Sequence, residues 1–113
     1  MRAVSVAPYR PAYYVHAKIR SWRKFRDQKK VWEGARPNEF RGLDFESAVD
    51  LLLALNAAKS LRDLSPLSSI GLHKLKGDRK GQWAMTVNER WRICFEFRQG
   101  DAYDVELVDY HKG

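Results

Sequence analysis

The sequence has a single cysteine, Cys94, among its 113 residues. One cysteine cannot form a disulfide bond within the chain, and it excludes zinc sites built from cysteine pairs. Because Cys94 lies in an apolar segment, we expect it to be a buried packing residue rather than a nucleophile. The three histidines, His16, His73 and His111, lack the spacing of metal ligands. The sequence therefore predicts no metal site and no cofactor.

Long apolar segments are also missing. The longest, residues 51–55, is far shorter than the roughly 20 residues that a membrane-spanning helix needs. Residues 1–17 contain Pro8 and Pro11 and no apolar segment of the kind found in signal peptides. We therefore expect a cytoplasmic protein.

Acidic residues are in the minority, with 14 Asp and Glu against 21 Lys and Arg and a net charge of +7. The basic excess lies in residues 1–43, which hold 11 basic and 3 acidic residues, whereas residues 71–113 hold 8 and 7. Such an excess favours a polyanionic partner. A chain of this length, 44% hydrophobic, is long enough for one domain with a single core.

The first half of the chain has the apolar period of helices. We expect a helix over residues 23–33 that ends at Gly34. A second helix is predicted to begin after Asp44, whose side chain suits an N-cap, and to extend to about residue 58. Its core-facing positions recur at helical spacing and are Phe45, Ala48, Val49, Leu52 and Leu55. A short turn follows at residues 61–64.

From Gly71 onward the period changes to two, which is typical of strands. Strands are predicted over residues 83–87, 91–98 and 103–108, joined by hairpin connections, with a short edge strand at residues 19–22. The predicted fold is α+β, with two N-terminal helices packed on one face of a small, mostly antiparallel sheet.

The alternation also predicts which side chains face the helices. In the strand over residues 91–98 they are Trp91, Ile93, Phe95 and Phe97, which leaves Arg92 on the open face. In the strand over residues 103–108 they are Tyr103, Val105 and Leu107. By itself, an arginine in the position of Arg92 is equally well explained as a solvated surface residue.

Three motifs follow one another in the last third of the chain. They are His-x-Leu-Lys-Gly-Asp-Arg-x-Gly from His73, Trp-Arg-Ile-x-Phe from Trp91, and a closing Asp-Tyr-His at residues 109–111. In this order and spacing they resemble the HigB toxins, the plasmid-maintenance branch of the RelE-like endoribonucleases. The resemblance covers residues 18–111, strongly from Leu72. It implies a RelE-like, microbial-ribonuclease-like toxin domain at residues 18–113 after an N-terminal extension at residues 1–17.

The resemblance also implies a catalytic set at the motif positions. Cleavage of RNA without a metal needs a base for the 2′-hydroxyl, an acid for the leaving 5′-oxygen, and cations around the phosphate. On this view His111 or Asp109 is the base and His73 the acid, although exchanging acid and base fits the sequence equally well. The remaining members are two phosphate-binding cations and a tyrosine that positions the nucleotide: Lys76, Arg92 and Tyr110.

His73 and Lys76 have opposite parity, so a regular strand would point them to opposite faces. We therefore expect that strand to bend or end before Lys76. Further basic residues are candidates for contacts with phosphates of ribosomal RNA, or are simply solvated surface residues: Arg79 and Lys80 at a hairpin tip, and Arg23 and Lys24 in the first helix.

The function implied by the resemblance is that of a type II toxin that cuts mRNA in the ribosome and is neutralised by a HigA-type helix-turn-helix antitoxin. The toxin itself is expected to be a monomer within that complex. Two alternatives remain open on the residues alone. One is a small ribonuclease that does not need the ribosome, and the other is a non-catalytic module that binds RNA or an antitoxin.

Overall fold

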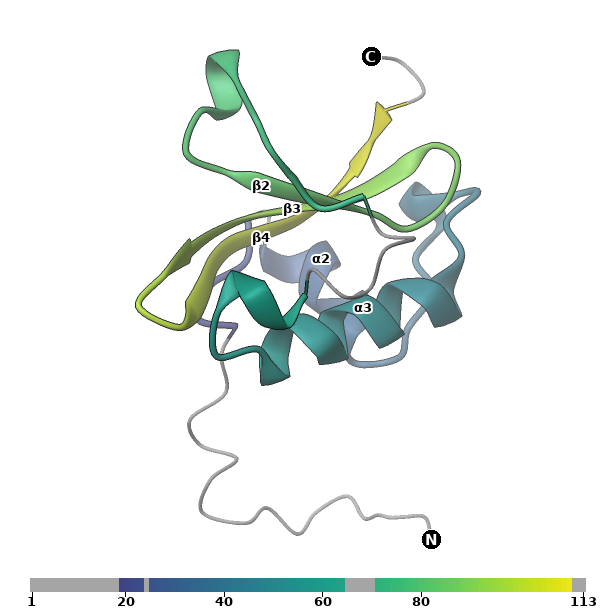
Figure 1. Ribbon diagram of the computed structural model, residues 1–113. Helices are drawn as coiled ribbons and strands as arrows, with labels where there is room; N and C mark the ends of the chain where they lie inside the picture. The colour runs from purple at the N-terminus through teal and green to yellow at the C-terminus, as the bar shows by residue number, and fades with distance from the viewer. Residues whose placement is uncertain (1–18, 24, 65–70, 111–113) are drawn as a thin grey trace, which may run out of the picture.

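The computed structural model describes residues 19–23, 25–64 and 71–110 (Figure 1). Within these residues two α-helices, α2 (Phe25–Trp32) and α3 (Phe45–Ala57), precede a four-stranded sheet. Figure 1 shows both helices on the same side of that sheet. The predicted α+β class is therefore confirmed.

The helix ends follow from local sequence. At the end of α2, Gly34 has φ +97°, and the amides of Gly34 and Ala35 donate to the carbonyls of Val31 and Lys30. This is the pattern of a Schellman cap. At the start of α3, the Asp44 carboxylate accepts hydrogen bonds from the Ser47 amide at 3.1 Å and the Ser47 hydroxyl at 2.9 Å. These bonds lower the pKa of Asp44 and confirm the predicted N-cap.

The helical layer is less regular than the sequence predicts, so the two-helix prediction is confirmed only in general form. Within the described residues, α2 spans Phe25–Trp32 rather than residues 23–33. A turn of 3-10 helix, η2 (Asn38–Phe40), follows it and buries Phe40. A second 3-10 turn, η3 (Leu61–Asp63), occupies the turn expected after α3.

The sheet has the strand order β1-β2-β3-β4, and every neighbouring pair is antiparallel. The strands are β1 (His73–Lys74), β2 (Trp83–Thr86), β3 (Trp91–Arg98) and β4 (Asp101–Asp109). In place of the expected edge strand at residues 19–22, Ile19 and Trp22 form isolated parallel bridges with Ala102 and Val105 of β4. The sheet is thus mostly antiparallel, as predicted.

The core lies between β3 and the helices. Trp91, Ile93 and Phe95 of β3 are buried there against Leu52 and Leu55 of α3. Of the predicted stripe on α3, Ala48, Leu52 and Leu55 are fully buried, while Phe45 and Val49 pack at its border. This packing leaves the other face of the sheet uncovered by α2 and α3 (Figure 1).

A β-bulge in β4 overturns one predicted orientation. Cys94 pairs with Glu106 but Glu96 pairs with Tyr103, so β4 carries one extra residue at Asp104, which has φ +53°. Ser21 stabilises the bulge, since its hydroxyl accepts from the Asp104 amide at 2.8 Å. The bulge reverses the parity of β4. Tyr103 therefore lies on the face opposite the core, and the expectation that it shares a face with Val105 and Leu107 is wrong.

Gln28 is a buried polar residue that provides a hydrogen-bond acceptor for the backbone of β4. Its side chain is 3% exposed, and its Oε1 accepts a hydrogen bond of 2.6 Å from the amide of Leu107. Replacing Gln28 by leucine leaves that amide buried without an acceptor, and we expect a loss of about 1–3 kcal/mol in the free energy of unfolding. Chemical denaturation measures this. Lys30→Ala, on the exposed side of α2, is the control and should change stability by less than about 0.5 kcal/mol; equal losses in both variants would contradict the explanation.

Candidate active site on the open face of the sheet

Alternate residues of the strands point to the face away from the helices. Directly paired residues share a face, so the pairings of His73 with Ala84, Ala84 with Cys94 and Cys94 with Glu106 form one row across all four strands. Arg92 has the parity of Cys94 and lies on the same face, as predicted. Neighbouring strands are about 4.8 Å apart, so the backbones of His73 and Cys94 are separated by about 10 Å.

Arg92 and Tyr110 lie together at one end of this face. The Arg92 Nη1 donates to the carbonyl oxygens of Asn88 at 2.9 Å and Trp91 at 3.1 Å, which fixes the guanidinium against the β2–β3 connection. Its Cζ is 5.2 Å from the centroid of the Tyr110 ring. Because these bonds use one terminal nitrogen, Nε and the second terminal nitrogen can donate to an anion such as a phosphate.

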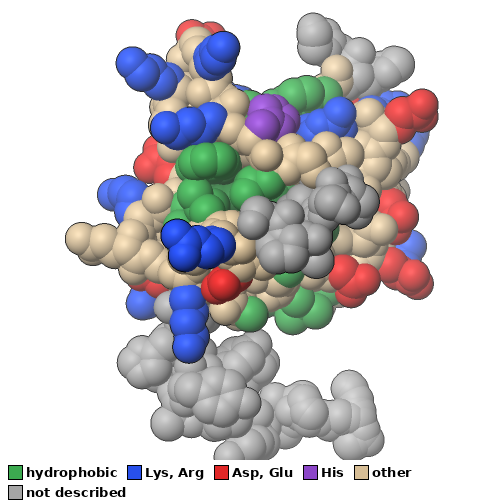
Figure 2. Space-filling model, in the orientation of Figure 1, with side chains coloured by type: hydrophobic (Ala, Val, Ile, Leu, Met, Phe, Trp, Pro, Cys, Tyr) green, Lys and Arg blue, Asp and Glu red, His purple; other side chains and the backbone are tan. Residues whose placement is uncertain are grey.

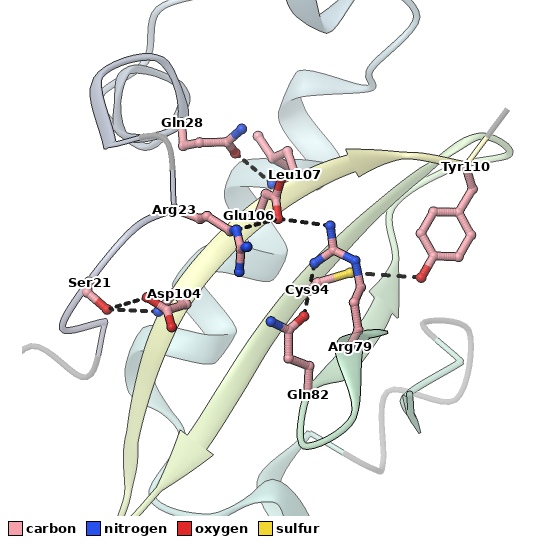
Figure 3. Close-up of polar contacts among 10 residues, drawn as sticks. All are labelled: Ser21, Arg23, Gln28, Arg79, Gln82, Cys94, Asp104, Glu106, Leu107 and Tyr110. Carbon is pink, nitrogen blue, oxygen red and sulfur yellow. Dashed lines mark hydrogen bonds and ion pairs between the residues drawn. The ribbon is translucent and has the colours of Figure 1, made fainter. Parts of the chain in front are cut away.

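Tyr110 is suited to donate a hydrogen bond rather than to act as a base. Partial burial raises the pKa of Tyr110, and Cys94 acts in the same direction, while the charges of Arg79 and Arg92 oppose the shift. The phenol is therefore neutral at pH 7. Its hydroxyl is 3.9 Å from the Sγ of Cys94 (Figure 3). Burial also raises the pKa of Cys94, which is fully buried, as expected for a packing residue.

His73 is exposed on β1, and its ring has a defined orientation. Its Nδ1 is 2.8 Å from the carbonyl oxygen of Gly71. A carbonyl only accepts, so Nδ1 carries the proton and Nε2 is the variable position. The neutral ring therefore offers Nε2 as a base, and the charged ring offers it as an acid. Strand β1 ends at Lys74, so it does end before Lys76, as the parity argument required.

Lys76 begins the hairpin that contains the 3-10 turn η5 (Gly77–Arg79). Together with Lys74 and Lys80 it lines a recess of about 430 Å³. Figure 2 shows lysine and arginine side chains gathered over this hairpin. The structure thus groups Lys76 with other lysines. Among the described residues, neither Arg92 nor Tyr110 lines this recess.

Arg79 belongs to the same hairpin but turns inward over the sheet instead of outward at the tip. Its Nη2 is 3.0 Å from the Oε1 of Glu106, and its Nη1 donates to the Oε1 of Gln82 at 3.0 Å (Figure 3). Glu106 is only 6% exposed. The Nε of Arg23 lies 3.8 Å from the same carboxylate oxygen, so Arg23 also points to this cluster. Lys24 lies outside the described residues.

Asp109 of β4 lies on the face of the sheet opposite to that of Arg92. It pairs with Trp91, whose side chain faces the core, and it lines a groove of about 450 Å³ that includes Gln28 and Phe40. Arg90 binds its carboxylate through Nη2 at 2.7 Å and Nε at 3.2 Å. These bonds raise the pKa of Arg90. The carbonyl of Arg90 also accepts from the amide of Tyr110 at 2.6 Å, so Arg90 anchors the end of β4.

The comparison with known proteins decides the family. Residues 23–111 match the family model for the RelE-like toxin of the type II toxin-antitoxin system HigB. The chain belongs to the HigB-like toxin family. It is also similar to the "Endoribonuclease HigB" of Proteus vulgaris, with 36% identity over 88 residues that cover 78% of this chain and 95% of that protein. The resemblance inferred from the three motifs is therefore confirmed.

In this HigB-like toxin the structure brings some of the predicted site residues together and separates others. Arg92 and Tyr110 are in contact, and His73 shares their face. Lys76 and Asp109 lie beside other groups, and His111 lies outside the described residues. Sequence reasoning missed Arg90, Gln82 and Glu106. For Glu106 the sequence held one signal. It alternates with the core-facing residues Val105 and Leu107, which predicts that its side chain lies on the opposite face of the sheet.

Two further features concern the described residues only. In that part of the chain, no three His, Cys, Asp or Glu side chains are grouped so that they could hold a metal ion. No helix there is long and apolar enough to cross a membrane. Near the site, the side chains of arginines and lysines contact carboxylates, carbonyl oxygens and aromatic rings.

Proposed function

We propose that this HigB-like toxin is an endoribonuclease that cleaves mRNA on the ribosome and so stops translation. The observation that carries the proposal is the contact of Arg92 with Tyr110 on an open sheet face that also presents His73. These groups supply a cation, a hydrogen-bond donor and an acid–base group at one surface. The name of the Proteus vulgaris relative supports the reaction class.

The proposed reaction needs no group beyond side chains. The 2′-oxygen of the RNA attacks the adjacent phosphorus as a base removes its proton, and the bond from phosphorus to the 5′-oxygen breaks as an acid protonates that oxygen. The products are a 2′,3′-cyclic phosphate and a 5′-hydroxyl. His73 supplies Nε2 as the acid, since its Nδ1 is occupied by the Gly71 carbonyl. Arg92 and Lys76 stabilise the added negative charge on the phosphate oxygens.

The ion pair of Asp109 favours His111 as the base. The Arg90 fork contacts both carboxylate oxygens of Asp109, so this carboxylate is already engaged in a two-point ion pair. Asp109 also lies on the face of the sheet opposite to that of Arg92. We assign it the role of holding the strand end, and with it Tyr110, in place.

The proposed biological partner is a HigA-type helix-turn-helix antitoxin, bound to a monomeric toxin in the cytoplasm. The description of the matching family as type II toxins supports an antitoxin that is a protein. Contacts with ribosomal RNA are assigned to Lys80 of the η5 hairpin and to Arg23 and Lys24, which precede α2 in the sequence. Purified ribosomes programmed with mRNA test this function, since naked mRNA should remain intact under the same conditions.

Cleavage is expected to be independent of a divalent metal at the scissile phosphate. An mRNA with a single phosphorothioate at the mapped cut site should be cleaved at a rate that is the same in Mg²⁺ and in Mg²⁺ supplemented with Mn²⁺. The reason is that arginine and lysine side chains, and not a metal, bind the phosphate oxygens in the proposed site. Ribosomes stay intact in both buffers, so the comparison isolates the reaction. A specific recovery of rate with Mn²⁺ would count against the mechanism.

A further inference from the structure

A buried carboxylate holds an arginine above the open face of the sheet. Glu106 and Gln82 are 6% and 5% exposed, and each places an oxygen 3.0 Å from a different terminal nitrogen of Arg79. Burying a charged carboxylate costs free energy unless it is paired. Glu106 therefore stabilises Arg79 in this one orientation, and Gln82 fixes the plane of the guanidinium (Figure 3).

The held guanidinium still has donors to offer. Its two bonds use one hydrogen on each terminal nitrogen, and a guanidinium carries five N–H groups in a planar fork. Arg79 also lies near the groups of the proposed site. Its partner Glu106 pairs across the sheet with Cys94, whose Sγ lies 3.9 Å from the Tyr110 hydroxyl (Figure 3). The ring of Tyr110 in turn contacts the Arg92 guanidinium. Arg79 from the η5 hairpin and Arg92 from β3 thus approach the same part of the open face.

We propose that Arg79 is a second phosphate-binding arginine of the cleavage site, and that Glu106 and Gln82 are positioning residues that hold it there. The inference rests on the proposed function and deepens it. It differs from the expectation that Arg79 contacts ribosomal RNA from a hairpin tip, because the side chain turns inward over β3 and β4.

Glu106 supplies an opposite charge for an arginine that shares its sheet face with Arg92. Like charges repel, so an arginine on this hairpin needs such a partner to stay over that face. The carboxylate of Glu106 offsets one charge and keeps the guanidinium in place before the substrate arrives. Donors fixed in this way stabilise developing charge without reorganisation during the reaction. Arg92 is held similarly by backbone carbonyls, so both arginines are oriented in advance.

The test is a double-mutant cycle of Arg79→Ala and Glu106→Gln, assayed by cleavage of ribosome-bound mRNA with saturating toxin. Arg79→Ala should lower the rate constant about 100- to 1,000-fold, with little change in the toxin concentration that gives half of the maximal rate. Glu106→Gln should lower it about 10-fold, through a less well oriented Arg79. The double variant should be no slower than Arg79→Ala alone, because Glu106 acts only through Arg79.

Arg98→Ala is the matched control. Arg98 also contacts a glutamate, Glu96 at 3.6 Å, and stacks over a ring, Tyr103 at 4.0 Å, at the far end of β3. Its removal should change the rate less than about 2-fold. If Arg79→Ala unfolds the protein, Arg79→Lys replaces it; a single ammonium cannot reproduce the fork that spans Glu106 and Gln82, so the rate should still fall at least about 10-fold.

Three results would overturn the inference. The first is a wild-type rate in folded Arg79→Ala. The second is an equal effect of Glu106→Gln with and without Arg79, which would make Glu106 a stability residue. The third is a folded wild-type toxin that cleaves no ribosome-bound mRNA, which removes the proposed function itself and is distinguished from the first two because the wild type then fails as well.

Discussion

Replacement of His73 by alanine is expected to lower the rate of mRNA cleavage by ~100- to 10,000-fold and to abolish growth arrest when the toxin is induced. Lys76→Ala and His111→Ala are expected to abolish toxicity as well, through loss of a phosphate contact and of the base. His73 and Lys76 are exposed, so both of their variants should fold as stably as the wild type. Thermal unfolding and growth arrest are measured on the same variants.

Lys74→Ala is the control for His73→Ala. Lys74 is the next residue on β1 and is also exposed, but its side chain lies over the Trp83 ring on the opposite face of the strand. Its removal should leave toxicity intact. If Lys74→Ala and His73→Ala weaken cleavage equally, the effect arises from β1 as a whole, and the acid–base assignment of His73 is wrong. A His73→Ala variant that is inactive only because its melting temperature collapses would equally remove the assignment.

Arg92→Lys is expected to be nearly as damaging as Arg92→Ala, with either change costing about 100- to 1,000-fold in rate. The guanidinium bonds to loop carbonyls through one nitrogen and has further donors in the same plane for a phosphate. The ammonium of lysine is a single point and cannot do both. Single-turnover cleavage of ribosome-bound mRNA measures the effect, and Arg98→Lys on the same strand is the control. An Arg92→Lys variant that keeps most of the rate would show that charge alone is required.

The parts of the fold that periodicity and capping determine were predictable from sequence. Asp44 and the apolar spacing after it define α3, and alternation defines β3 and the orientation of Arg92. The bulge at Asp104 was not predictable, because one extra residue in β4 leaves the apolar alternation of the sequence unchanged. The contact that stabilises the bulge comes from Ser21, a residue 83 positions away. Short elements such as η2 and β1 leave too few residues to show a period.

For the candidate site, sequence predicted residue types better than it predicted their arrangement. The motif positions named His73, Arg92 and Tyr110, which the structure places on one face, although their catalytic roles remain predictions. The partners of the charged groups were not predictable, since Arg79 meets Glu106 across 27 positions and Arg90 meets Asp109 across 19. Such pairs depend on the register of the strands and on the path of a hairpin, and the sequence shows neither directly.

The most direct test of the account is cleavage of one defined mRNA by the purified toxin, with and without ribosomes, and with the 2′-hydroxyl present or removed at the nucleotide before the mapped cut. The account predicts a cut only on ribosomes and only with the 2′-hydroxyl, leaving a 2′,3′-cyclic phosphate or 3′-phosphate and a 5′-hydroxyl. Cleavage that persists without the 2′-hydroxyl would contradict the chemistry. Equal cleavage of naked mRNA would contradict the ribosome dependence, and intact mRNA in every reaction would contradict the assignment of the toxin as an endoribonuclease.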